Sequence, residues 1–329
     1  MNNKIDFVLM WVDPSDPKWL SEKNKYTPND GADASDKRYR DWDNLRYWFR
    51  GVEKYAPWVN NIYFITYGHL PKWLNTKHPK LKIVKHSDFI PEEYLPTFSA
   101  NPIEMNVHRI KGLSDNFVLF NDDVFLINPT KPKDFFKNDL PRDAACMYIN
   151  IPSGETIDAI INNDICIINK YFSAREVLKK DFLKWFNIKN GKYLYNNITL
   201  SIYNKFVGIH FSHLPTSFRK DAFEEIWKKE FETLDKTCRN KFRSPDDVNQ
   251  WLVKYWQICK GNFSPRSVRW GKYYEYGMGY NELRNIFNSR KYLSTCLNDT
   301  IEDSKLDEAI MITNELFERK FPEKSEFEI

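Results

Sequence analysis

Short apolar runs alternate with amphipathic stretches along the first third of the chain. Leu45, Trp48, Phe49 and Val52 recur at helical spacing and predict an amphipathic helix. Strands that alternate with such helices indicate an α/β fold with a mostly parallel central sheet. The runs that are too short for helices and rich in β-branched and aromatic residues predict buried strands at 6–12, 61–66, 81–84 and 117–120.

The second half of the chain has the periodicity of helices. Helices are predicted at 173–187, 220–238 and 248–258. Ser244 and Pro245 are expected to be the N-cap and the first residue of the last of these. The pattern therefore predicts three parts: an α/β core at 1–169, a helical lobe at 170–262, and a return to the core with a final helix at 263–329.

Charge is spread along the chain. The 329 residues carry 49 basic and 45 acidic side chains, a net charge of +4, with no arginine-rich stripe, so nucleic acid is not an expected partner. Basic pairs such as Lys179 and Lys180 are interpreted as solvated helix faces. A weak attraction to an anionic membrane surface stays open as an alternative.

Cysteine use and hydropathy bear on the compartment. The chain has 5 Cys, an odd number without a CxxC motif, which favours reduced thiols over a disulfide framework or a zinc site. The first apolar run is interrupted by Asp13 and is too short for a signal peptide. No run approaches the ~20 apolar residues that cross a bilayer. We expect a cytoplasmic protein, either free or in peripheral contact with the inner face of the membrane.

The most informative polar group follows the strand at 117–120. Asn121, Asp122 and Asp123 stand where that strand ends. The carboxyl ends of strands are where open α/β sheets bind ligands. Carboxylate and amide oxygens suit Mg²⁺ or Mn²⁺, which in turn hold substrate phosphates. The alternative interpretation is a turn with two solvated carboxylates.

A second polar group follows the first strand and opens the first helix. Asp13 comes after the strand at 6–12, and a turn-capping role is equally open for it. Asp41, Asn44 and Arg46 lie at the start of the helix that contains Trp48. A helix N-terminus suits a phosphate group, and arginine adds a planar fork for its oxygens. The alternative is an ordinary solvated helix face.

Four segments of the chain resemble the Stealth proteins, a family of hexose-1-phosphate transferases. The first reads IDFVLMWVD and ends at Asp13. The second, at 40–126, contains RDWDNLRYWFRG and NFVLFNDDVF. The third joins His213-Leu214-Pro215 to the sequence FRSPDD that contains Arg243. The fourth, CLND, ends at Asp299.

The resemblance implies a nucleotide-sugar-transferase-like (GT-A-like) core and a transfer of sugar-1-phosphate. The donor would be a UDP-sugar, the acceptor a hydroxyl of a glycan, free or lipid-linked, and the leaving group UMP. The product would be a phosphodiester in a bacterial capsular or cell-surface polysaccharide. The first part of the chain would then bind the nucleotide-sugar, and the helical lobe would lie on the acceptor side.

Roles for individual residues follow from this chemistry. Asp122, Asp123, His213 and Arg243 are predicted to be catalytic, with His213 as the general base because imidazole titrates near neutrality. Mg²⁺ or Mn²⁺ is predicted to bind Asp122, Asp123 and Asp299. The residues predicted to bind substrate are Asp13, Arg40, Asp41, Asn44, Arg46, Asn106, Arg109 and Asn298.

Two other functions stay open at this point. A metal-dependent glycosyltransferase that releases UDP would use the same acidic strand end. A non-catalytic glycan-binding module would use the chain's many Trp and Tyr side chains, 11 and 18 in number, as stacking surfaces.

Overall fold

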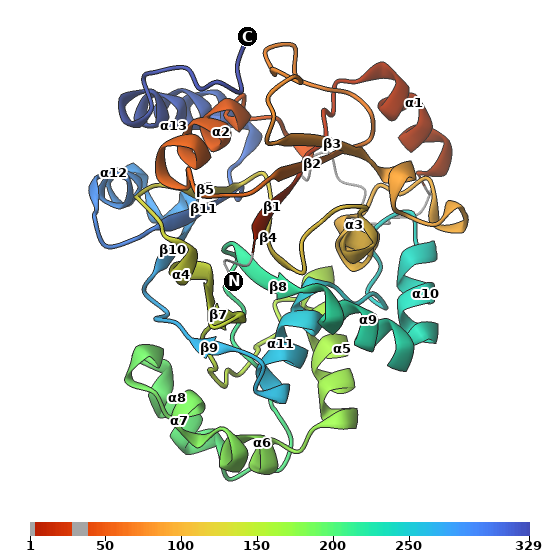
Figure 1. Cartoon of the computed structure of the whole chain (residues 1–329), viewed down its shortest axis with the longest axis vertical. Coiled ribbons are helices and arrows are strands. Elements are labelled where there is room, and N and C mark those ends of the chain that lie inside the picture. The colour runs from red at the N-terminus through yellow and green to blue at the C-terminus, as the bar shows by residue number, and fades with distance from the viewer. Residues whose placement is uncertain (1–3, 28–38) are drawn as a thin grey trace.

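A five-stranded sheet lies at the centre of the molecule (Figure 1), in the order β3-β2-β1-β4-β8. The computed structural model describes residues 4–27 and 39–329. Four of the strands are parallel, and β8 pairs antiparallel with β4. The predicted mostly parallel α/β sheet is therefore confirmed. The strands are β1 (Ile5–Met10), β2 (Ile62–Thr66), β3 (Leu81–Lys85), β4 (Asn116–Phe120) and β8 (Thr216–Arg219).

The strand order contains a topological switch point between β1 and β4. The chain steps outward from β1 to β2 and β3, and then returns to place β4 on the other side of β1. Leu9 of β1 is paired with Phe120 of β4, so both strands end at the same level. Open α/β sheets bind ligands outside the carboxyl ends of the strands at such a point. The segments after Met10 and after Phe120 are thus the expected place of the site.

Both faces of β1 are covered. All six of its residues are buried, and alternate side chains point to opposite faces. Phe7 and Leu9 join a core with α2 (Leu45–Tyr55) and α13 (Leu306–Lys320). Val8 and Met10 join a second core with α5 (Thr156–Tyr171) and α11 (Gln250–Lys260). This two-sided burial explains why the strand is apolar from Phe7 to Met10.

A small sheet places β11, from the last part of the chain, next to the end of β4. Its order is β10-β11-β5, with β5 (Val124–Leu126), β10 (Gly271–Glu275) and β11 (Ser294–Asn298). Cys296 of β11 is paired with Val124, and Leu297 N–H donates to the carbonyl of Asp123 over 2.8 Å. A third small sheet consists of β6 (Phe136–Lys137), β7 (Leu140–Asp143) and β9 (Ser264–Pro265).

The second half is rich in helices, as predicted, but it is not separate from the sheet. Trp256 of α11 lies in the same core as Val8 of β1, and β8 belongs to the central sheet. The predicted boundary at residue 170 falls inside α5. The three-part division therefore stays a prediction. The other helices are α1 (Pro17–Tyr26), α3 (Ala100–Asn106), α4 (Pro132–Phe135), α6 (Ala174–Lys180), α7 (Phe182–Trp185), α8 (Tyr193–Leu200), α9 (Lys220–Lys229), α10 (Phe231–Arg239) and α12 (Tyr280–Asn288).

Three helix predictions were wrong in detail. The predicted helix at 173–187 is broken at Asp181, and the one at 220–238 is broken at Glu230. Ser244 and Pro245 do not start α11. The side chain of Asn249 caps that helix by accepting from Trp251 N–H. The segment before it is instead held by the buried Asp247 carboxylate, which accepts from Ser244 N–H.

In the described part of the chain, every helix is too short or too polar to span a lipid bilayer.

A buried ion pair fixes the C-terminal segment against α2. Arg50 donates to both carboxylate oxygens of Glu328, over 2.7 and 2.9 Å, and to the carbonyl of Phe321 over 2.7 Å. The side chains of Arg50 and Glu328 are 7% and 3% exposed. Burial on its own would raise the pKa of Glu328, but hydrogen bonds from Arg50 and Ser325 outweigh it and lower that pKa.

Glu328→Ala is expected to lower the free energy of unfolding by about 3 kcal/mol, because it removes the buried partner of Arg50 and leaves only the half-exposed Glu318 carboxylate beside that charge. Since the pKa of Glu328 is lowered, the wild-type advantage is complete above the ordinary Glu value of 4.5 and is lost as the pH falls through the folded-state pKa. Urea denaturation at a series of pH values measures both effects. Glu326→Ala is the matched control, because its side chain is 83% exposed. Equal effects of the two changes would contradict the assignment.

Candidate active site

The site is organised around Asp123, in the turn between β4 and β5. His213 Nε2 lies 3.6 Å from Asp123 Oδ2, and the Cys296 thiol donates to the same oxygen over 3.3 Å. The three residues come from the end of β4, the segment before β8, and β11. The structure therefore brings together, at the switch point, residues that are far apart in the sequence.

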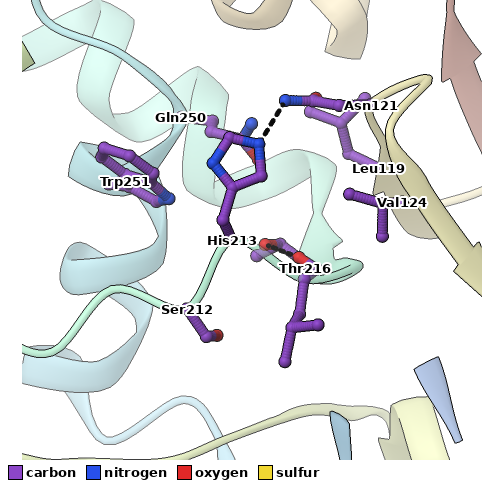
Figure 2. Close-up of a pocket in the computed structure, with 9 residues that line it drawn as sticks. Leu119, Asn121, Val124, Ser212, His213, Thr216, Gln250 and Trp251 are labelled. Atoms are coloured by element: carbon purple, nitrogen blue, oxygen red, sulfur yellow. Dashed lines mark hydrogen bonds between the residues drawn. The ribbon is translucent and has the colours of Figure 1, made fainter. Parts of the chain in front are cut away.

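His213 stands at the centre of a small cavity (Figure 2). Its Nε2 lies 3.2 Å from the Asn121 amide nitrogen. Trp251, at the start of α11, presents its ring edge-on with the centroids 6.2 Å apart. The side chain of His213 is 30% exposed, so an acceptor group can reach it. The cavity is lined by Leu119, Asn121, Val124, Ser212, His213, Leu214, Thr216, Gln250 and Trp251.

The electrostatics separate the roles of the two aspartates. Burial would raise the pKa of Asp123, but the positive charge and hydrogen bond of His213 outweigh it, so this carboxylate stays ionised. Burial and then the charge of Asp123 raise the pKa of Asp122 to about 7. The Asp122 side chain still contacts water. The burial that raises its pKa therefore reflects the many protein atoms around the carboxyl group.

The imidazole responds in the opposite sense. Burial would lower the pKa of His213, but the charge of Asp123 and the hydrogen bond to it raise the pKa above the ordinary value. An imidazole that gains a proton at this position is therefore stabilised by Asp123. Glu104 raises the same pKa and Arg243 lowers it, so both lie within electrostatic range of His213.

The donor set suits a hard divalent cation. Asp123 Oδ1 is buried and has no hydrogen-bond partner among the described residues. The polar side-chain atoms of Asp123, His213 and Cys296 lie within 4.8 Å of one another, a grouping that would also suit zinc. Burial and Asp123 raise the pKa of the Cys296 thiol, so it stays protonated and acts as a donor. The carboxylate oxygens of Asp122 and Asp123 are then the ligands that fit Mg²⁺ or Mn²⁺.

Asp13 and Asp41 add negative charge near Asp122. The charge of Asp41 raises the pKa of Asp122, and the charge of Asp13 raises that of Asp41, although burial is the largest cause for both carboxyls. Asp13 Oδ1 accepts from Ser15 N–H over 2.8 Å, and its own N–H donates to His69 over 2.7 Å. Asp13 therefore caps its turn and also faces the acidic group.

The start of α2 contributes the predicted phosphate-binding residues. Asn44 is the N-cap of α2 but makes no side-chain capping bond. Arg46 donates to Asp43 over 2.9 Å, and its charge lowers the pKa of Asp41. Asp41 and Arg46 thus lie within electrostatic range of each other. Asp41 in turn lies within electrostatic range of Asp122.

Asp299 has partners that differ from those predicted. Its carboxylate accepts from Arg40 over 3.1 and 3.3 Å, from Trp42 Nε1 over 3.1 Å and from Ile301 N–H over 3.2 Å. Arg40 also pairs with Asp303. This set of donors favours an ion-pairing role for Asp299 over the predicted metal-ligand role. It fixes the segment that follows Asn298, the last residue of β11.

Two predicted substrate-binding residues are not brought to the site. Asn106 is buried and donates to the carbonyl of Pro102 and to the sulfur of Cys238. The Arg109 guanidinium stacks on the ring of Trp227, 4.8 Å from its centroid. Both side chains face α9 and α10, because α3 ends at Asn106 and the chain turns through a 3₁₀ helix at Val107–Arg109. Proximity in sequence to the acidic strand end was a poor guide here.

Sequence reasoning gave no individual site role to four residues of this region. Asn121 directly precedes the aspartate pair, and Cys296 belongs to the CLND segment, so both had a local signal. Glu104 is buried and accepts from the amide of Gln250 over 2.9 Å and from its N–H over 3.2 Å. No local sequence pattern indicates that Glu104 and Gln250 lie close to His213, and only the fold shows it.

Comparison with known proteins places the chain in a family. The models of Stealth protein conserved regions 1 and 2 match residues 3–31 and 38–143. "Capsular polysaccharide phosphotransferase WcwK" of Streptococcus pneumoniae is 47% identical over 100% of both chains. "Receptor polysaccharide phosphotransferase WefC" of Streptococcus oralis is 39% identical over 99% of this chain and 100% of that one. The chain belongs to the Stealth family. The resemblance seen in the sequence motifs is thus confirmed.

More distant relatives extend the picture of this Stealth protein. "Exopolysaccharide phosphotransferase cps2G" of Lactiplantibacillus plantarum is 36% identical over 98% of this chain and 96% of that one. Among solved structures, the galactosyltransferase LgtC covers 95% of each chain at 9% identity, with a TM-score of 0.39. This TM-score is too low to support a conclusion about the fold. The fold described above is established by the strand order of the central sheet.

Asp123→Asn is expected to lower the pKa of His213, because burial and Arg243 both act against the imidazolium and Asp123 is the main group that favours it. An NMR titration of the imidazole, without divalent cations, measures this, and the spectrum of His213→Gln assigns the signal. Asp307→Asn on the exposed surface of α13 is the control. An unchanged pKa in Asp123→Asn would show that the two side chains are not coupled.

Proposed function

We propose that this Stealth protein transfers sugar-1-phosphate from a UDP-sugar to a hydroxyl of a glycan acceptor and releases UMP. The product is a phosphodiester in a bacterial capsular or other cell-surface polysaccharide. The observation that carries the proposal is the Asp123–His213 pair at the switch point, in a chain that is 47% identical over its whole length to a protein named as a capsular polysaccharide phosphotransferase.

The reaction needs a base at the acceptor hydroxyl. The acceptor oxygen attacks the phosphorus bonded to the sugar, and its proton passes to His213. The bond from that phosphorus to the oxygen bridging it to UMP breaks, and UMP leaves with the electron pair. Asp123 stabilises the imidazolium that forms, which agrees with the raised pKa of His213.

The remaining residues position phosphate and balance its charge. Phosphoryl transfer depends on positioning and electrostatic stabilisation more than on covalent chemistry. Asp122 and Asp123 would hold Mg²⁺ or Mn²⁺, which when bound neutralises the charge of the diphosphate. Arg243 lies within electrostatic range of His213 and would balance negative charge that develops on the transferred phosphoryl group. Arg46 and the free N–H groups at the start of α2 suit the donor phosphates.

Purified protein supplied with Mg²⁺, a panel of UDP-sugars and a glycan acceptor is expected to release UMP and to give a phosphorus NMR signal of a diester in the product. This outcome follows from attack at phosphorus. Attack at the anomeric carbon instead releases UDP and leaves the product free of phosphate. That result would establish the alternative, a metal-dependent glycosyltransferase.

His213→Ala is expected to lower kcat by about 10²–10⁴-fold, the usual contribution of a general base. Asp123→Ala is expected to lower it by a similar factor and to raise the Mg²⁺ concentration required for half-maximal rate, because it removes both a ligand and the partner of His213. Initial rates of UMP release measure these effects. Asp307→Ala, an exposed carboxylate on α13, is the matched control. Wild-type turnover in either variant would exclude that residue from the reaction and would favour a non-catalytic module.

A further inference from the structure

The segment from α7 to α8 exposes large apolar side chains to water. Six of them, between 54% and 87% exposed, define what we call the α7–α8 surface: Phe182, Leu183, Ile188, Tyr195, Ile198 and Ile202. Isolated exposed apolar residues are ordinary, whereas a contiguous group on one segment marks a contact surface.

This segment buries amides as well as apolar side chains. Its fully buried side chains are Trp185 and two amides, Asn190 and Asn197. Each amide donates to the carbonyl of Ala145 over 2.9 Å and to that of Trp185 over 2.6 Å. A helix in water normally turns its apolar side chains inward and its polar ones outward. Here, Trp185, Leu200 and the hydrogen bonds of the two amides hold the segment to the body, and six other apolar side chains face outward.

The same region carries the net positive charge of the chain. Residues 173–207 contain 7 basic and 2 acidic side chains, a net charge of +5, whereas the other residues contain 42 basic and 43 acidic ones. Lys179, Lys180, Lys189 and Lys192 are exposed among the apolar residues. Such a mixture matches the boundary of an anionic bilayer, where apolar groups enter the acyl region and lysines meet the headgroups.

The surface lies at one end of the molecule and leads to the site. Figure 1 shows α6, α7 and α8 at the end of the long axis opposite α13. The ring of Tyr193 in α8 packs against His210, with 4.3 Å between centroids, and His210 is three residues before His213. A bilayer on this side would bring a lipid-linked acceptor towards the imidazole.

We propose that the α7–α8 surface binds the surface of an anionic lipid bilayer. The charge disfavours a second copy of the chain as its occupant, because two surfaces of the same sign repel each other. For Lys179 and Lys180, the proposal adopts the alternative of attraction to an anionic membrane over that of a merely solvated helix face. It rests on the proposed function only for the nature of the acceptor, since the binding itself needs no turnover.

Sedimentation with vesicles tests this without donor or acceptor. The wild-type protein is expected to bind vesicles of phosphatidylglycerol and phosphatidylcholine, to bind pure phosphatidylcholine more weakly, and to dissociate as salt is raised. The triple change Leu183→Asn, Ile188→Asn, Ile198→Asn is expected to weaken the partition by about tenfold or more, because it removes apolar area from the membrane contact. Met311→Asn, at an exposed apolar residue of α13, is the matched control.

Three results would overturn the proposal. The first is that the wild-type protein does not bind anionic vesicles. The second is that the triple variant binds them as well as the wild type does. The third is that the wild-type protein binds no vesicles but forms a concentration-dependent dimer, which the triple variant does not form. The last would assign the surface to self-association. Thermal unfolding confirms the fold of the triple variant, with Ile188→Asn alone as a second test. UMP release with a soluble acceptor is measured separately, so loss of membrane binding is distinguished from failure of the proposed reaction.

Discussion

The charge of Asp123 is the constraint around which the molecule is arranged. A carboxylate in a crowded position is unfavourable unless hydrogen bonds and an opposite charge compensate it. One oxygen of Asp123 is compensated by His213 and Cys296, which come from segments 90 and 173 residues further along the chain. The strand order places the end of β4 at the switch point, and β11 returns beside β5 to supply the thiol. The fold thus serves to bring remote donors to one acceptor.

This arrangement divides the work between two neighbouring carboxylates. Asp123 stays ionised because it has an imidazole partner, and Asp122 resists ionisation because of burial and, second, because it lies beside an existing charge. Residues whose surroundings push their pKa values apart are typical of sites that perform acid–base or electrostatic chemistry. A divalent cation beside both would remove the repulsion and allow both to be ionised.

Much of the sheet was predictable, because three of its four parallel strands, β1, β2 and β4, are short, mostly apolar runs buried on both faces. β8 was not predicted, since Thr216–Arg219 is short and polar and is recognisable only by its pairing with β4. In the site, Asp123 and His213 lie together, as their common assignment from the family motifs suggested, while the catalytic roles of Asp122, Asp123, His213 and Arg243 stay predictions. Asn106 and Arg109 lie elsewhere, because helical spacing does not show which neighbour a face will meet. The contact of Cys296 with Asp123 depends on a strand pairing between residues far apart in sequence, although the CLND motif marks the segment that contains Cys296.

The return of β11 to the end of β4 has a consequence for biosynthesis. A ribosome releases the chain from its N-terminus, so Asp123 emerges long before its thiol donor Cys296. A nascent chain that has exposed the central sheet still lacks β11, which pairs with β5 directly after the aspartates. Glu328, which pairs with Arg50 of α2, is translated later still. The protein therefore remains without its full set of active-site contacts until β11 has been translated.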